Sequence, residues 1–184
     1  NYQSAVFSPM NILFFIFPFV DAWSLLILLQ PFLAAFFTYF FLRELKLSKL
    51  GSLVGSSVFM FCGFMVVWMA YGTLSYAILF LPLSLYAIER WFNKKDKLSL
   101  FLLFLSIPFS FFSGHFQTSI YFLAFAFSYL IFKFITVKKD YRPIALVFLL
   151  GLLTSMIQII PSVQFYLEST RSGIFLHQGG IPLY

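Results

Sequence analysis

The sequence predicts an all-α fold: a polytopic bundle of transmembrane helices, with six spanning helices and a short N-terminal interfacial helix. The first observation is composition, because the 184 residues are 61% hydrophobic and only 10% charged, whereas a soluble domain carries about 25% charged residues. The second is the 29 phenylalanines, which could not all be hidden in one soluble core. The third is a series of apolar segments close to the ~20 residues that cross a bilayer.

The N-terminal residues 1–21 are expected to form an outer segment. Within it, residues 11–20 are apolar but too short to span, which predicts an interfacial or re-entrant helix broken near Pro18. Asp21 stands directly before the first apolar span and is interpreted as a helix N-cap. Six segments within residues 22–160 then qualify or nearly qualify as spans: 22–42, 51–70, 73–88, 98–112, 116–137 and 143–160.

The C-terminal residues 161–184 are mixed and polar enough to form an outer loop. No repeat period and no low-complexity linker interrupts the pattern, so residues 1–184 predict a single membrane domain. Because the sequence starts at Asn1 rather than at a methionine, we expect it to be a piece of a longer protein.

The distribution of basic residues predicts the orientation of the helices. Eleven of the twelve Lys and Arg residues fall in or beside the loops after the first, third and fifth spans, and only Arg171 falls on the other side. Positively charged short loops stay cytoplasmic. Both ends of the sequence and the turn at residues 114–118 are therefore expected on the outer face of the plasma membrane. The net charge of +6 reports topology, and no nucleic-acid partner is expected.

Charged residues are nearly absent from the interior of the spans. Asp21, Glu44 and Glu89 lie at span ends, where a helix cap or a neighbouring cation explains them. Ion-coupled transporters carry ionisable groups near the midplane because these form the pathway, so a transporter is disfavoured. The single Cys62 has no partner for a disulfide, and neither a metal site nor a cofactor is predicted.

A polar turn, SGHFQT at residues 113–118, interrupts the apolar pattern. The span before it has 15 residues and reaches about 22 Å of the roughly 30 Å of hydrocarbon, which predicts a turn recessed into the outer leaflet. Gly114 suits a tight turn, Ser113 is expected to cap the next helix, and a helix N-terminus beside His115 suits a phosphate. The alternative is an ordinary capped hairpin, which is the commoner case for such a turn considered alone.

The segment PSVQFYLESTRSG at residues 161–173 contains the only outer basic residue. Arginine binds phosphate in a bidentate way that lysine cannot match, so Arg171 is a candidate phosphate ligand. The alternative is an ion pair with Glu168, three residues earlier on a helix. The two interpretations can coexist.

Three stretches resemble the YfhO family of bacterial polytopic proteins: NYQSAVFSPMNILFFIFP, GHFQTSIYF and PSVQFYLESTRSG. The resemblance implies a GT-C-type membrane glycosyltransferase, which moves a sugar from a polyprenyl-phosphate carrier to an acceptor on the outer face. It also implies that the catalytic carboxylate lies upstream of Asn1. The positions that match family motifs are Tyr2, Gln3, Pro9, Gly114, His115, Gln117, Thr118, Ser169 and Arg171.

The resulting hypothesis is that this sequence is part of a glycosyltransferase that modifies cell-envelope glycans. A carboxylate base would deprotonate the acceptor hydroxyl, and donors around the leaving lipid phosphate would stabilise its charge. The expected partners are membrane lipids, the polyprenyl-phosphate-linked sugar donor and an outer-face glycan or lipid acceptor. The alternatives are a lipid or lipid-linked-sugar flippase and a non-catalytic membrane scaffold. The candidate substrate-binding residues are Gln3, Gly114, His115, Gln117, Thr118, Glu168, Ser169 and Arg171.

Overall fold

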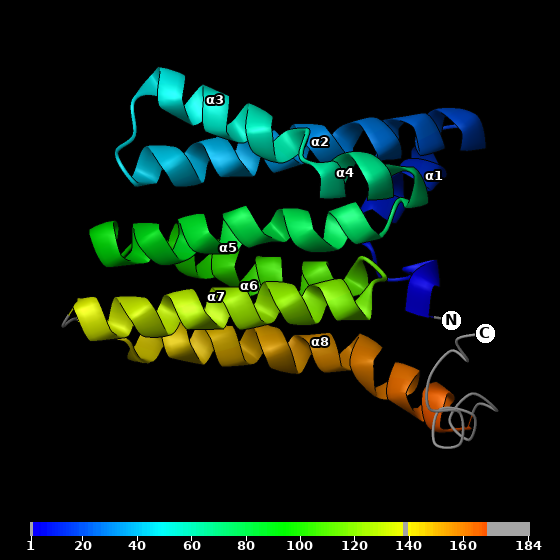
Figure 1. Ribbon diagram of the computed structural model, residues 1–184. Helices are drawn as coiled ribbons and strands as arrows, with labels where there is room; N and C mark the ends of the chain where they lie inside the picture. The colour runs from blue at the N-terminus through cyan, green and yellow to red at the C-terminus, as the bar shows by residue number, and fades with distance from the viewer. Residues whose placement is uncertain (1, 138–139, 169–184) are drawn as a thin grey trace, which may run out of the picture.

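The predicted all-helical class is confirmed. A computed structural model describes residues 2–137 and 140–168, and within these ranges all regular structure is helical. Figure 1 shows α2 and α3 on one side of α5 and α6, and α7 and α8 on the other side. The closest packing joins α2 to α3 and α5, joins α5 to α6 and α7, and joins α6 to α8. The elements are η1 Tyr2–Ser4, η2 Pro9–Ile12, α1 Leu13–Ile16, α2 Phe19–Glu44, α3 Lys49–Met60, α4 Gly63–Trp68, η3 Met69–Tyr71, α5 Leu74–Lys94, α6 Lys97–Phe112, α7 Phe116–Thr136 and α8 Arg142–Glu168.

The predicted count of six spans is not confirmed. Among the described residues, α2, α7 and α8 are long and apolar enough to cross a membrane, and a bent pair, Lys49–Met60 with Gly63–Tyr71, makes a fourth if counted as one span. The helix α6 is apolar but has only 16 residues. The helix α5 packs against α2, α6 and α7 and buries most of its side chains. Because protein rather than lipid covers α5, its sequence does not need the hydropathy of a lipid-facing helix.

The predicted break near Pro18 is confirmed, but residues 19–20 belong to the first long helix and not to the short N-terminal one. The short helices η2 and α1 end at Ile16, and Pro18 is the N-cap of α2. Asp21 is therefore the third residue of α2 and not its N-cap, which corrects the prediction. Its carboxylate lies in the first turn, where the positive end of the helix dipole stabilises a negative charge.

Two other expected elements differ from the structure. The segment predicted as one span at 51–70 breaks at Phe61 and Cys62, where the two halves meet at an angle of 42°. We call residues 61–73, from this break to the start of α5, the elbow. The helix α8 continues through Pro161 to Glu168 instead of ending at residue 160, so residues 161–168 are helix rather than loop. Figure 1 shows α8 bending towards this end, and a proline inside a helix is a known cause of such a bend.

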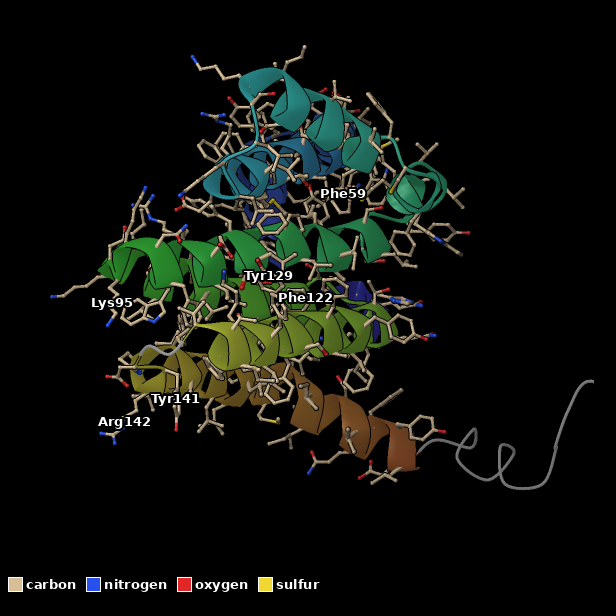
Figure 2. All side chains as sticks on the ribbon, turned by 60° about the vertical axis from the view of Figure 1, so that its left-hand side comes forward. Phe59, Lys95, Phe122, Tyr129, Tyr141 and Arg142 are labelled. Carbon is tan, nitrogen blue, oxygen red and sulfur yellow. The ribbon has the colours of Figure 1, made fainter. Side chains whose placement is uncertain are left out.

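Every Lys and Arg in the described ranges lies at one end of the bundle, which we call the basic end. There α2, α5 and α7 finish while α3, α6 and α8 begin. Figure 2 shows Lys95 and Arg142 at this same end, although they come from different connections. The clustering of basic residues that was expected from the sequence is thus a property of the fold.

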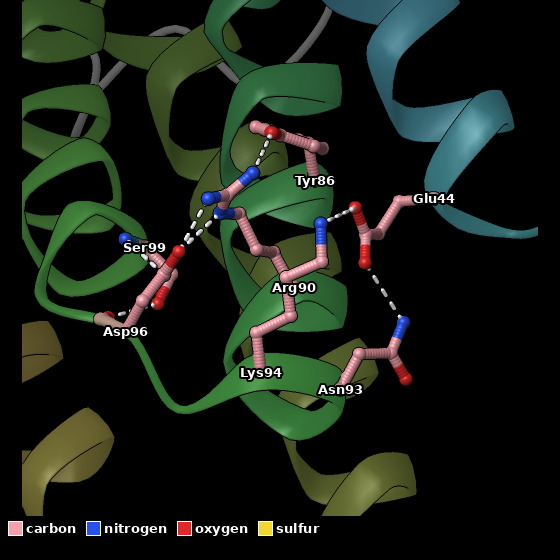
Figure 3. A network of polar contacts seen from close by, with 7 residues as sticks. All are labelled: Glu44, Tyr86, Arg90, Asn93, Lys94, Asp96 and Ser99. Atoms are coloured by element: carbon pink, nitrogen blue, oxygen red, sulfur yellow. Dashed lines mark hydrogen bonds and ion pairs between the residues drawn. The ribbon is translucent and has the colours of Figure 1, made fainter.

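Two acidic residues at the basic end, Glu44 and Asp96, accept hydrogen bonds from neighbouring side chains. Arg90 donates to Asp96 (Nε–Oδ2 2.7 Å) and to the hydroxyl of Tyr86, while Glu44 accepts from Asn93, as Figure 3 shows. Asp96 also caps α6 by accepting from the backbone N–H of Ser99. The hydrogen bonds from Arg90 lower the pKa of Asp96 to about 2. These contacts fix the tight connection between α5 and α6.

Candidate functional site

The turn between α6 and α7 is enclosed by the N-terminal segment. Gly114 has φ +86°, a conformation that L side chains rarely adopt, and a Cβ there would lie 2.8 Å from the Cβ of Ala5 and 3.2 Å from the carbonyl oxygen of Tyr2. The hydroxyl of Tyr2 donates to the carbonyl oxygen of Phe111 at 2.7 Å. Polar backbone below a membrane surface needs protein or water around it, and the N-terminal segment supplies protein. The depth of the turn in a bilayer stays a prediction.

The residue that caps α7 is His115 and not Ser113. The Nδ1 atom of His115 accepts from the backbone N–H of Thr118 at 3.3 Å and lies 2.7 Å from the Thr118 hydroxyl oxygen. Ser113 instead terminates α6, where its hydroxyl donates to the carbonyl oxygen of Phe109. A nitrogen that accepts a hydrogen bond from an amide carries no proton. The cap therefore fixes a neutral imidazole with its proton on Nε2.

A cavity of about 740 Å³ lies beside this turn, at the end of the bundle away from the basic end. Its volume falls within the range of about 300–1,000 Å³ that is usual for small-molecule sites. One wall is the elbow, another is the first two turns of α7, and the beginning of α5 lies between them. The lining residues are Gln3, Phe64, Trp68, Tyr71, Thr73, Leu74, Ile78, His115, Gln117, Thr118 and Tyr121.

The elbow wall is anchored to the interior of the bundle. Gln30 of α2 is fully buried and donates from Nε2 to the carbonyl oxygen of Met69 at 2.9 Å. The hydroxyl of Ser75 donates to the carbonyl oxygen of Met65 at 3.4 Å. Gly72, the next-to-last residue of the elbow, adopts φ +68°. Irregular backbone among apolar helices needs such partners, because unsatisfied peptide groups cost several kcal/mol in hydrocarbon.

The family assignment follows from comparison with known families. The family model described as bacterial membrane protein YfhO matches residues 2–178. The chain belongs to this family. Neither the comparison with curated proteins nor that with solved structures found a match. The matched range includes the three stretches that carried the resemblance, except for Asn1. The chain is therefore a membrane protein of the YfhO family, and its described residues have an all-helical fold.

The cavity of this YfhO protein brings together four of the candidate residues, which come from two distant parts of the sequence. Gln3, His115, Gln117 and Thr118 all line it. Gly114 is buried in the turn and shapes it without lining the cavity. Glu168 is the exposed last residue of α8 and is not part of the lining. Ser169 and Arg171 lie outside the described residues.

Sequence reasoning missed the aromatic wall of the site. Phe64, Trp68 and Tyr71 come from the elbow, and Tyr121 comes from the second turn of α7, where its hydroxyl accepts from Nε2 of Gln117 at 2.6 Å. The sequence held one signal: Trp68 and Tyr71 lie just before Gly72, in the connection between the second and third predicted spans, and the basic residues place this connection on the same side as the GHFQT motif. Within the described ranges, His, Cys, Asp and Glu form no group of three that could hold a metal.

The cap on α7 predicts a pH-dependent stability. Burial lowers the pKa of His115 below its usual value of 6.5. As the pH falls, His115 therefore binds a proton in the unfolded chain before it does so in the folded protein. The stabilisation is complete above pH 6.5 and is lost as the pH falls through the lower pKa of the folded state. We expect unfolding temperatures of the wild type to fall between pH 7 and 5.

The variant His115→Asn is the control for this prediction, because asparagine is a strong N-cap that does not titrate. It is expected to lose this part of the pH dependence while losing less than about 1 kcal/mol of stability at pH 7. Identical pH profiles for the wild type and His115→Asn would contradict the assignment of His115 as a neutral cap.

Proposed function

We propose that this YfhO family member is part of a membrane glycosyltransferase that moves a sugar from a polyprenyl-phosphate carrier to a glycan or lipid acceptor on the outer face of the plasma membrane. The observation that carries the proposal is the cavity, which gathers Gln3 with the GHFQT side chains at the end away from the basic residues. A pocket with a few convergent polar groups is the usual form of a substrate site.

The orientation of the cavity rests on the basic end. Basic loops stay cytoplasmic, so the opposite end, with the cavity, belongs outside. For α5 and α6 we propose that they also cross the membrane within the bundle, because they run alongside the three helices that qualify as spans. Their polar atoms are covered by neighbouring helices, as where Ser110 of α6 donates to the carbonyl oxygen of Ala77 of α5.

The described residues supply neutral groups to the site, so the charges for the reaction come from elsewhere in the protein. The acceptor hydroxyl needs a carboxylate base, which the family resemblance places upstream of Asn1. The leaving lipid phosphate needs cationic donors. His115 is neutral because its Nδ1 accepts the hydrogen bond that caps α7. We therefore assign the cationic role to Arg171, whose planar guanidinium can bind two phosphate oxygens at once.

The composition of the cavity favours transfer over ion-coupled transport. Of its described lining residues, His115 alone has a usual pKa near neutral pH. The ion pairs between described helical residues, Glu89 with Lys133 and Glu44 with Lys94, lie at or near the basic end. A proton or ion pathway across the bilayer needs a chain of such groups.

The test is a transfer assay with the full-length protein in vesicles that contain a radiolabelled polyprenyl-phosphate sugar. Arg171→Lys keeps the positive charge but loses the planar guanidinium that binds two phosphate oxygens. We therefore expect the transfer rate to fall about 10- to 100-fold, which corresponds to about 1.4–3 kcal/mol in activation free energy. The matched control is Arg43→Lys at the basic end, which should leave transfer unchanged. Labelled lipid that crosses the bilayer uncleaved would indicate a flippase instead. Wild-type transfer by folded Arg171→Lys would remove Arg171 from the site.

A further inference from the structure

The described walls of the cavity carry no formal charge. Its lining consists of aromatic rings, the amides of Gln3 and Gln117, the hydroxyls of Thr73 and Thr118, a neutral imidazole and aliphatic carbon. A phosphate that moves from water to a site with neutral groups loses favourable hydration. Only charged donors, or several N–H groups that point at the phosphate, compensate for this loss. An uncharged ring with several hydroxyl groups is matched better, because amide, imidazole and hydroxyl groups both donate to and accept from it.

Two aromatic rings form a platform on the elbow wall. The ring centroids of Trp68 and Tyr71 lie 5.5 Å apart, with an interplanar angle of 49°. The side chain of Tyr71 is 62% exposed, and Tyr121 on the α7 wall is 61% exposed. The C–H faces of a pyranose ring pack on aromatic faces through dispersion, while its hydroxyl groups point sideways to polar partners. Aromatic rings with polar groups beside them suit a sugar.

Several polar atoms beside the platform keep hydrogen-bonding capacity. Gln117 donates one N–H to the hydroxyl of Tyr121, which leaves its carbonyl oxygen and second N–H. His115 uses Nδ1 for the cap, so Nε2–H is its remaining donor. Thr73 is the N-cap of α5 but makes no side-chain cap hydrogen bond. These groups stand on helix ends and on the anchored elbow, and such rigid placement is what a specific site needs.

The other hollows of the described structure have different linings. The one between α7 and α8, about 440 Å³, is lined only by Ile, Leu, Ala and Phe. The one at the basic end, about 450 Å³, is lined by Arg43, Glu44, Lys46, Asn93 and Lys94. A third, about 350 Å³, is lined by Tyr2, Phe116, Ile159, Ser162, Val163 and Tyr166. Its side-chain polar groups are hydroxyls, whereas the cavity beside the GHFQT turn adds amide and imidazole groups to its aromatic rings.

We propose that this cavity is the subsite for an uncharged pyranose ring, stacked on Trp68 and Tyr71 and hydrogen-bonded by Gln117 and His115, with the lipid phosphate held outside these walls. The inference rests on the proposed function, since it names the part of the donor or acceptor that the cavity receives. It predicts that the site recognises sugar without the phosphate.

The experiment measures binding of methyl glycosides of glucose, galactose and N-acetylglucosamine by saturation-transfer NMR, with the purified full-length protein in nanodiscs free of sugar detergents. Inorganic phosphate and sugar-free polyprenyl phosphate are the competing probes. At least one glycoside is expected to bind with its ring C–H protons saturated, and inorganic phosphate should not displace it. Trp68→Leu is expected to weaken binding at least tenfold and Gln117→Leu at least fivefold. Phe125→Leu, an exposed aromatic of α7 away from the cavity, should change it less than twofold.

The outcomes separate this inference from the proposed function. Failure of all three glycosides to bind, wild-type affinity in Trp68→Leu, or displacement by inorganic phosphate would each overturn the sugar subsite, even where the same preparation transfers sugar. Glycoside binding that depends on Trp68 in a protein without transfer activity would uphold the subsite and overturn the glycosyltransferase.

Discussion

Replacing Lys133 with alanine is expected to destabilise the bundle by about 3–5 kcal/mol. Its Nζ lies 2.8 Å from Oε2 of Glu89, and both side chains are largely buried between α5 and α7. Tyr129 also donates to this carboxylate at 2.7 Å. Removing the ammonium leaves a buried carboxylate without its countercharge, which costs more than the pair itself contributes. The free energy of unfolding in mixed micelles measures the loss.

Two control variants sharpen this prediction. The double variant Glu89→Gln with Lys133→Met removes both charges and is expected to recover most of the loss, because no uncompensated charge remains. Lys94→Ala breaks a 3.8 Å pair with Glu44 in which the Lys94 side chain is half exposed. It should cost less than about 1 kcal/mol, because the Glu44 carboxylate keeps its hydrogen bond from Asn93. A loss in Lys133→Ala no larger than that in Lys94→Ala would contradict the account of a buried pair.

Gly114→Val is expected to cost about 2–5 kcal/mol and to distort the site. The left-handed conformation costs a residue with a Cβ about 1–2 kcal/mol, and forcing atoms into packed space adds about 1–3 kcal/mol. The new Cβ would press on Ala5 and on the carbonyl oxygen of Tyr2, so the N-terminal segment must move. Because this segment carries Gln3 into the cavity, substrate binding should weaken along with stability.

The matched control is Gly63→Ala at the start of α4. A Cβ at Gly63 would have no atom within 4 Å, and its φ is not in the left-handed range. We expect its free energy of unfolding to stay within about 0.5 kcal/mol of wild type. Equal stabilities for Gly114→Val and Gly63→Ala would show that the N-terminal segment does not pack on the turn.

The sequence predicted those parts of the fold that depend on local composition. Apolar length and breaker residues were enough for the helical class, for the break at Pro18 and for the start of α7 at Phe116. The break at Phe61 and Cys62 was missed because no proline marks it. Contacts from elsewhere in the sequence hold it, such as the bond from Gln30 to Met69. The continuation of α8 through Pro161 was missed because a proline can bend a helix without ending it.

The candidate site also has a part that the sequence predicted and a part that it missed. The GHFQT turn was found from its polarity, but the choice between Ser113 and His115 as the cap depended on where α6 ends. Ser113 is taken by the last turn of α6, which leaves His115 to reach Thr118. The wall formed by Trp68 and Tyr71 was missed because long-range packing around α5 brings it to the turn, and spacing along the sequence does not encode this contact.

The central claim is that the cavity faces outward and receives a lipid-linked sugar, and site-directed labelling at Gln117 tests it most directly. Gln117 is exposed and lines the cavity. Cys62→Ser removes the one thiol of these 184 residues, and any cysteine elsewhere in the full-length protein is replaced as well. The account predicts that Gln117→Cys in this background reacts in intact cells with a maleimide that cannot cross membranes. It also predicts that added polyprenyl-phosphate sugar slows the reaction. Labelling only after the cells are permeabilised, or an unchanged rate with the lipid-linked sugar, would contradict the claim.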